Sequence, residues 1–215
     1  MATDKKFGLL KGLEEIYICE VEDTVDAYTP KGEPEQLIPA GEMTVSKSIE
    51  KQQFYFDNAM WAEAGQEAPS EMSIIGAAVR AAFLAWIEGK DVDAATGAIL
   101  DDGDWHNKFY AISGKKSYTD GSTENFWFLK ASFGGAEEAA KTKDGTTDAS
   151  GMTLPFTAYS TLHKFKDGKH RKVIRIDSTT TKIKADQSWT KQVVTPDNLG
   201  DICEKVTETA ATTEE

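Results

Sequence analysis

The feature that most constrains the fold is a two-residue alternation of apolar and polar side chains that recurs along the chain. Residues 152–159 place an apolar side chain at every second position, and residues 15–21 and 43–48 alternate in the same way. Successive side chains of a strand point to opposite faces of a sheet, so this pattern predicts strands with one buried face. Residues 125–133 are largely apolar and aromatic and predict a strand that is buried on at least one face.

Turn signals mark the ends of further predicted strands. The aromatic run at residues 53–56 ends at residues 57–58, an Asp and an Asn whose side chains can hydrogen-bond their own backbone in a turn. Together with residues 43–48, this run predicts a strand pair with a polar outer face. Residues 71–75 can form one more strand, which brings the expected total to six to eight.

The last third of the chain predicts a hairpin and a short helix. An Asp-Gly pair within residues 166–169 suits a tight turn between two strands at residues 158–165 and 171–177. Residues 195–204 begin with Thr-Pro-Asp, which is typical of the start of a helix.

Residues 77–88 have apolar side chains at helical spacing instead. They include several alanines and are followed by Gly89, a common C-terminal stop of helices. This pattern predicts a helix over residues 77–88 that packs an apolar stripe on the sheet. A second interpretation makes two aromatic residues of this stripe, Phe83 and Trp86, the filler of a partner's groove. The stripe consists of positions i, i+4, i+7 and i+8, namely Val79, Phe83, Trp86 and Ile87.

Strands that do not alternate with helices favour a mainly β fold, an antiparallel β-sandwich or partly open barrel with one flanking α-helix. The 215 residues suit a single domain over residues 1–215, because β folds often reach this length. Three of the six prolines predict a loop near residues 29–42, and a stretch without large apolar side chains predicts another at 134–151. The polar end predicts a flexible C-terminal tail near residues 205–215.

Neither a membrane span nor a disulfide framework is expected. The longest nearly apolar stretch, residues 74–87, has 14 residues and is interrupted by Arg80, whereas a spanning helix needs roughly 20. The first residues lack the apolar stretch of a signal peptide. Cys19 and Cys203 lie far apart and form no CxxC pair, which is typical of reduced cytosolic thiols.

The charge is strongly acidic and unevenly distributed. A net charge of -12 argues against a protein that grips DNA, because Lys and Arg supply most of the non-specific affinity for phosphate. Residues 1–104 carry 8 Lys and Arg against 21 Asp and Glu, a balance of -13, whereas residues 163–191 carry 9 against 3, a balance of +6. This asymmetry fits head-to-tail association of copies and fits neutralisation within one copy equally well.

Motifs of catalysis and metal binding are not found. Gly114-Lys-Lys-Ser117 lacks the earlier glycine of a phosphate-binding loop, and the aspartates around residues 91–104 do not have the spacing of a calcium loop. His106, His163 and His170 have no partner at metal-ligand spacing, and no serine lies in a nucleophile elbow. We therefore expect no catalytic residues, no cofactor and no metal, and a protein that is not an enzyme.

The order of these segments resembles that of the major tail proteins of long-tailed bacteriophages, the subunits that stack into the tail tube. The similar features run over residues 13–165. They are the early strand, a Pro/Gly-rich loop ending in Pro-Ala-Gly-Glu at 39–42, the Ser-rich strand at 44–48, the aromatic, acid and amide run at 50–58, the apolar segment up to Gly89, the Thr96-Gly97 turn followed by acids, and the late strand at 152–159.

This resemblance implies a β-sandwich with a flanking helix, assembled as hexameric rings that stack into a hollow tube for DNA delivery into the host. It implies a virion protein that is assembled in the host cytoplasm, with copies of itself, tape-measure and tail-terminator proteins as partners and no membrane. Double-stranded DNA would pass through without specific binding. Physical reasoning agrees, since a ring that joins neighbouring sheets satisfies their unpaired edges and an acidic conduit does not retain phosphates.

Two sets of residues are the candidates for this assembly. We expect a basic set to meet acidic surface on a neighbouring subunit, and a threonine face to line the lumen or meet solvent because the opposite face of its strand belongs to the core. The interface candidates are Lys164, Lys166, Lys169, Arg171, Lys172 and Arg175, and the lumen candidates are Thr153, Thr157 and Thr161.

A different class of function is a monomeric β-sandwich recognition module of a phage particle that binds a host-surface glycan. Such a module needs a concave patch of exposed aromatic residues. The candidates for it are Trp61, Trp105, Trp127 and Trp189.

Overall fold

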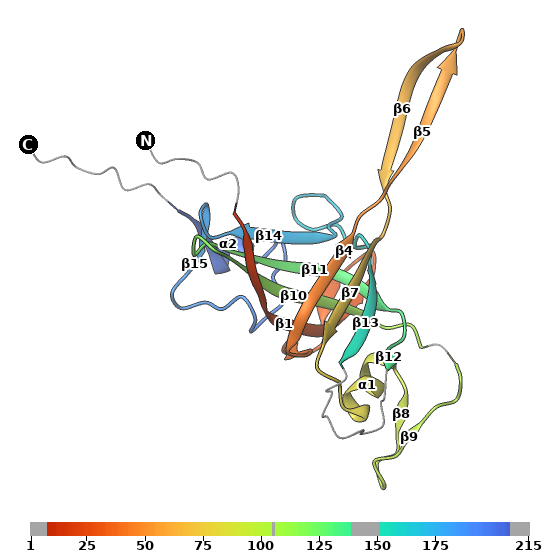
Figure 1. The fold of residues 1–215 in the computed structure, drawn as a ribbon, viewed down its shortest axis with the longest axis vertical. Helices are drawn as coiled ribbons and strands as arrows, with labels where there is room; N and C mark the ends of the chain where they lie inside the picture. The colour runs from red at the N-terminus through yellow and green to blue at the C-terminus, as the bar shows by residue number, and fades with distance from the viewer. Residues whose placement is uncertain (1–7, 105, 139–150, 207–215) are drawn as a thin grey trace, which may run out of the picture.

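The structure is a computed structural model that describes residues 8–104, 106–138 and 151–206. In these residues the chain is mainly β, with antiparallel pairing and two short helices (Figure 1). The elements are β1 (Leu10–Asp23), β2 (Tyr28–Pro30), β3 (Glu35–Gln36), β4 (Ala40–Ser46), β5 (Ile49–Phe56), β6 (Ala59–Glu67), β7 (Ser70–Gly76), α1 (Ala81–Glu88), β8 (Asp91–Val92), β9 (Ile99–Leu100), β10 (Phe109–Tyr118), β11 (Thr123–Phe133), β12 (Glu137–Glu138), β13 (Met152–Ala158), β14 (Val173–Asp177), β15 (Thr181–Ile183), α2 (Leu199–Ile202) and β16 (Cys203–Lys205).

The main sheet is strongly curved and does not close. Its strands follow the order β2-β1-β10-β11-β13-β7-β4, and β3, β12 and β14 pair with strands of this path. β1 and β4 belong to opposite ends of the order yet contact one another without a hydrogen-bonded register. The sheet therefore wraps around a core and leaves an open seam between β1 and β4, which agrees with the predicted β-sandwich with a flanking helix.

The core consists of two clusters on the two faces of β11. Phe126 and Phe128 point into the cluster enclosed by the curved sheet, whereas Trp127 and Leu129 point into a second cluster covered by the chain after β14. Trp127 donates its indole N–H to the carbonyl of Trp189 at 3.0 Å. This hydrogen bond holds the chain after β14 against β11. The apolar run at residues 125–133 is thus a strand with both faces buried.

Packing inside the first cluster is close enough to require a glycine. A Cβ at Gly114 in β10 would lie 2.4 Å from Cζ of Phe126 and 2.7 Å from Cδ1 of Ile16, distances that real Cβ atoms do not show. The missing side chain allows these two residues to meet across β10.

The predicted helix is present but begins later than expected. α1 starts at Ala81, because Arg80 has an extended backbone and the amide of Ala77 bonds to Pro39. Gly89 ends the helix in the left-handed conformation, as predicted. The aromatic stripe packs on the sheet: Trp86 stacks on Phe83 at 5.3 Å and contacts Tyr110 of β10 at 5.4 Å.

Several predicted strands have different partners. The aromatic run at residues 53–56 was expected beside residues 43–48, but β5 pairs with β6 and β4 pairs with β7. The hairpin of 158–165 with 171–177 is wrong: β14 pairs with β11, because Ile174 and Ile176 are buried in the second cluster. Its tight turn is present, where the amide of Gly168 donates to the carbonyl of Phe165 at 2.7 Å, and the amide of Thr161 donates to the carbonyl of Arg171 at 3.0 Å.

The loop predictions hold in part. Residues 29–42 contain β3 and parts of β2 and β4, so this segment is more ordered than its prolines indicate. The predicted start at residues 195–204 leads into the single turn of α2. Most of the loop at 134–151 and of the tail at 205–215 lies outside the described residues. The described part of the chain includes no helix with the length and apolarity of a membrane span.

Candidate functional site

A two-stranded hairpin, β5 and β6, projects from the body of the protein as an arm (Figure 1). It continues the direction of β4 and β7, and we call residues 49–67 the arm. Every residue of β5 is exposed, and so is all of β6 except one half-buried position. Eight residues at about 3.3 Å each make the arm about 26 Å long.

The end of the arm is a tight two-residue turn. Asp57 and Asn58 both have positive φ, 50° and 60°, as a primed hairpin turn requires. Asn and Asp tolerate this region better than other non-glycine residues, so the local sequence fixes the hairpin. The turn predicted at these residues is confirmed.

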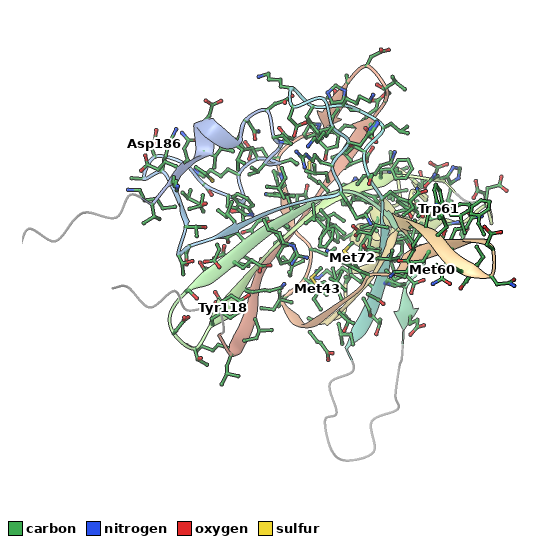
Figure 2. The ribbon with its side chains drawn as sticks, turned by 90° about the horizontal axis from the view of Figure 1, so that it is seen from above. Met43, Met60, Trp61, Met72, Tyr118 and Asp186 are labelled. Atoms are coloured by element: carbon green, nitrogen blue, oxygen red, sulfur yellow. The ribbon has the colours of Figure 1, made fainter. Side chains whose placement is uncertain are left out.

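The tip of the arm is aromatic and exposed. Phe56 and Trp61 contact one another edge to face at 5.5 Å, and Trp61 is nevertheless 77% exposed. Figure 2 labels Met60 and Trp61 on the projecting hairpin. Large apolar side chains clustered at one exposed place mark an interaction surface. The tip residues are Phe54, Tyr55, Phe56, Met60 and Trp61.

The shaft of the arm is polar instead. Glu63 forms an ion pair with Lys51 at 2.8 Å and accepts a hydrogen bond from the side-chain amide of Gln53 at 3.3 Å. The hydrogen bonds from Lys51 and Gln53 hold the pKa of the Glu63 carboxyl below its usual range. Within β5, the hydroxyl of Tyr55 donates to the side chain of Gln53 at 2.7 Å, which orients Gln53 toward the opposite strand. Polar cross-strand contacts therefore hold the strands together below an apolar tip.

The base of the arm is fixed to the body by Lys172. Its ammonium donates to the carboxylate of Glu67 at 3.0 Å, the carbonyl of Ala68 at 2.7 Å and the hydroxyl of Ser70 at 3.3 Å. The Lys172 side chain is only 10% exposed. The hydrogen bond from Lys172 and the charge of Lys172 lower the pKa of the Glu67 carboxyl. Lys172 thus fixes the place where the arm leaves the sheet, a role that sequence reasoning missed.

The six basic interface candidates do not form one available surface. Lys164, Lys166 and Lys169 are exposed, but the other three have partners within the chain. Arg171 forms an ion pair with Asp167, and Arg175 lies 3.2 Å from Glu124. Lys172 is engaged at the arm base, so neutralisation within one copy accounts for part of the basic cluster. Contact of the three exposed lysines with a neighbour stays a prediction.

The threonine candidates separate into two environments. Thr153 and Thr157 are half-buried on the outer face of β13, opposite the buried Met, Leu, Phe and Ala side chains. Thr161 is not on this face, which corrects the prediction. It lies beyond the end of β13, is 3% exposed, donates to the carbonyl of His163 at 2.9 Å and accepts from the amide of Arg171 at 3.1 Å.

The outer face of β13 continues across two neighbouring strands. Register places Ser73 of β7 beside Thr44 of β4, and Glu71 between Ser46 and Thr157. Small hydroxyl side chains and carboxylates therefore share this face with Ile75 and Pro155, and there is no Lys or Arg on its three strands.

The tryptophans do not form a recognition patch in the described residues. Trp127 and Trp189 are in the core, and Trp61 is on the arm tip. Trp105 lies outside the described residues. No group of three or more His, Cys, Asp or Glu side chains within the described ranges could hold a metal ion. Cys19 and Cys203 are buried free thiols.

Comparisons with known proteins give little guidance. No protein-family model matches the chain, and no curated protein matches it. Among solved structures, the chain is similar to one from a cryo-EM structure of the PVC sheath-tube complex of an extracellular contractile injection system in its extended state. The similarity has 10% sequence identity and a TM-score of 0.41, and covers 75% of this chain and 88% of the other. At this TM-score the likeness does not establish a shared fold.

Proposed function

We propose that this protein is a structural virion protein whose copies assemble as stacked hexameric rings into a phage tail tube, the conduit for DNA delivery. The observation that carries the proposal is the arm, because its aromatic tip is exposed on a hairpin that leaves the body (Figure 1). An isolated two-stranded hairpin is only marginally stable in water. A tip of this kind is stabilised when another molecule covers it, and the partner we infer is a second copy.

The arm favours an open assembly over a closed dimer. Its tip differs from the surface of the body, so a contact between tip and body is heterologous, and such contacts generate filaments when the rotation does not close. Contacts between rings are therefore assigned to the arm.

Lateral contacts within a ring are assigned to the edges of the sheet. In the described part of the chain β14 pairs with β11 alone, so its second edge has no strand partner. Such an edge is prone to pair with another chain, and joining the sheets of six copies would satisfy it. The exposed Lys164, Lys166 and Lys169 would contribute charge at the same boundaries.

The hydroxyl and carboxylate face of β4, β7 and β13 suits the lumen. Thr153 and Thr157 bind water well, while Glu42 and Glu71 repel phosphates. DNA would pass such a surface without binding. The tape-measure protein inside the tube and a tail terminator at its end complete the set of expected partners, in a particle assembled in the host cytoplasm.

Negative-stain imaging and light scattering of the purified protein test the proposal. The wild-type chain should form rings or tubes above a critical concentration. Phe56→Ser with Trp61→Ser should remove the stacking and leave monomers or single rings. The matched control is Val25→Ser with Leu100→Ser, which removes two equally exposed apolar side chains away from the arm and should assemble normally. A wild-type chain that remains monomeric at every concentration would refute the proposal and favour the glycan-binding module.

A further inference from the structure

A groove lies at the open seam of the sheet, between the first residues of β1 and β4. Its volume is about 590 Å³, within the range of pockets that bind ligands. Leu13 and Met43 lie on the two walls, and Phe126 of β11 forms part of the floor. The groove therefore offers an apolar interior between two strands that are not paired with each other.

The two strands present free edges at the groove. The early part of β1 pairs with β10 on one side, and β2 and β3 pair only from Tyr17 onward. β4 has β7 as its partner on its other side. In the part of the chain that the structure describes, backbone N–H and C=O groups are therefore available where the groove opens.

The rim of the groove is basic. Lys11 and Lys47 are exposed, and Lys116 and Arg175 both approach Glu124, at 3.1 and 3.2 Å. Glu42 is the one carboxylate among the described residues that line the groove. Four cations against the carboxylates of Glu42 and the adjacent Glu124 still leave the groove with a local charge opposite to the protein's overall charge of -12.

We propose that this groove binds the arm tip of another copy, an inference that rests on the proposed tube function and names the receptor for the arm. The arm carries four carboxylates, from Glu50, Asp57, Glu63 and Glu67, against the single ammonium of Lys51. Its tip is aromatic and ends at Asp57, so an apolar insert with an acidic end meets an apolar groove with a basic rim. The two surfaces are complementary in both properties.

The arm of the same copy does not reach this groove. Lys47 on the rim lies two residues before the arm begins, and the arm leads away from there for about 26 Å (Figure 1). The contact is therefore between copies, with one copy's arm in the next copy's groove. When each copy places its arm in the groove of the next copy, the copies form a stack. The groove of the first copy is empty, and the arm of the last copy is exposed.

Cross-linking between copies tests the contact directly. Copies with Ala59→Cys, an exposed position at the arm tip that leaves the five large apolar side chains in place, are mixed with copies with Leu10→Cys, a 60% exposed groove residue, and oxidised during assembly. Mixed disulfide dimers should form in these tubes. They should not form between Ala59→Cys and Leu100→Cys, which places the second thiol on β9, away from the groove. The native thiols are buried and do not compete.

A charge exchange gives an independent result. Asp57→Lys alone, and Lys11→Glu with Lys47→Glu alone, should each raise the critical concentration about tenfold, since several exposed ion pairs act together. Mixed or combined, the reversed charges should restore assembly toward the wild-type concentration. Lys169→Glu is the control for a basic residue outside the groove and should not be rescued by Asp57→Lys.

The outcomes separate the two proposals. Tubes without the mixed disulfide and without charge rescue would overturn the groove as receptor and leave the tube function standing. A monomeric wild-type chain would overturn both. Tubes with the mixed disulfide and the rescue would support both.

Discussion

Asp23 and Lys130 form an ion pair inside the protein, and breaking it should be strongly destabilising. The Asp23 side chain has no exposed surface and that of Lys130 is 7% exposed. One carboxylate oxygen accepts from Lys130 at 2.7 Å and from the amide of Leu162 at 2.7 Å, and the other accepts from the amide of His163 at 3.0 Å. The carboxylate thus fixes the segment after β13 to β1.

Replacing Asp23 and replacing Lys130 leave different charged groups buried without their partner. Asp23→Asn leaves the Lys130 ammonium buried, with the ring of Phe109 at 4.3 Å but without a counter-charge. Loss of one partner of a buried pair costs about 3–5 kcal/mol. Lys130→Met leaves Asp23 with its two backbone N–H donors, so the cost should be nearer that of one charged hydrogen bond, about 1.5–3 kcal/mol. Both are large against a total of about 5–15 kcal/mol.

Urea unfolding followed by tryptophan fluorescence measures these free energies, and the double variant completes a thermodynamic cycle. The double variant should lose less than the sum of the single losses. Lys51→Met, which removes an exposed ion pair of the arm shaft, is the control and should leave the unfolding midpoint unchanged. A Lys130→Met loss equal to or above that of Asp23→Asn, or an Asp23→Asn variant as stable as the wild type, would refute this reasoning.

Other predictions concern the arm base, a thiol, the core and DNA. Lys172→Glu should loosen the arm base and speed amide hydrogen exchange there, whereas Lys169→Glu should not. Because Lys172 lowers the pKa of Glu67, the contact between the two is fully present above the usual Glu pKa of about 4.3 and is lost as the pH falls through the lowered pKa. An NMR titration of the arm base measures this loss. Burial raises the pKa of the Cys19 thiol to about 11, so alkylation at pH 7.5 should be slow until the chain unfolds, and fast labelling of the folded protein would contradict this. Gly114→Ala should cost about 1–3 kcal/mol by overpacking, seen as a lower thermal midpoint. Assembled tubes should bind duplex DNA no more tightly than about micromolar at physiological salt, and sub-micromolar affinity with a steep salt dependence would reverse the assignment of the lumen.

The strands that bury one or both faces could be predicted from the sequence. β11 and β13 lie at the predicted residues because burial imposes a clear pattern on their side chains. β6 was missed for the opposite reason: an arm exposed on both faces has no burial pattern to read. The five large apolar residues around the turn at residues 57–58 were the available signal, since a chain does not gather such residues at an exposed turn without a partner.

Long-range partners account for the other errors. The Asp-Gly turn was located correctly, but the partner of β14 is decided by the apolar surface of β11, about fifty residues away. Lys172 and Glu67 are 105 residues apart, and nothing near Lys172 in the sequence indicates that its charge is already neutralised. Thr161 continues the spacing of Thr153 and Thr157, but β13 ends at Ala158. Side chains beyond Ala158 therefore no longer alternate between the two faces of the sheet.

The arm is also a lever that joins the sheet through β4 and β7 and is held at its base by Lys172. A tilt of about 5° at its base would move a tip about 26 Å away by roughly 2 Å, enough to separate packed side chains. Lys172, held by the arm base at three acceptors, therefore sets how rigidly one copy could transmit its orientation to the next. If copies stack through their arms, the bending stiffness of the filament depends in part on this ammonium group, and a softer anchorage would give a more flexible tube from an equally stable subunit.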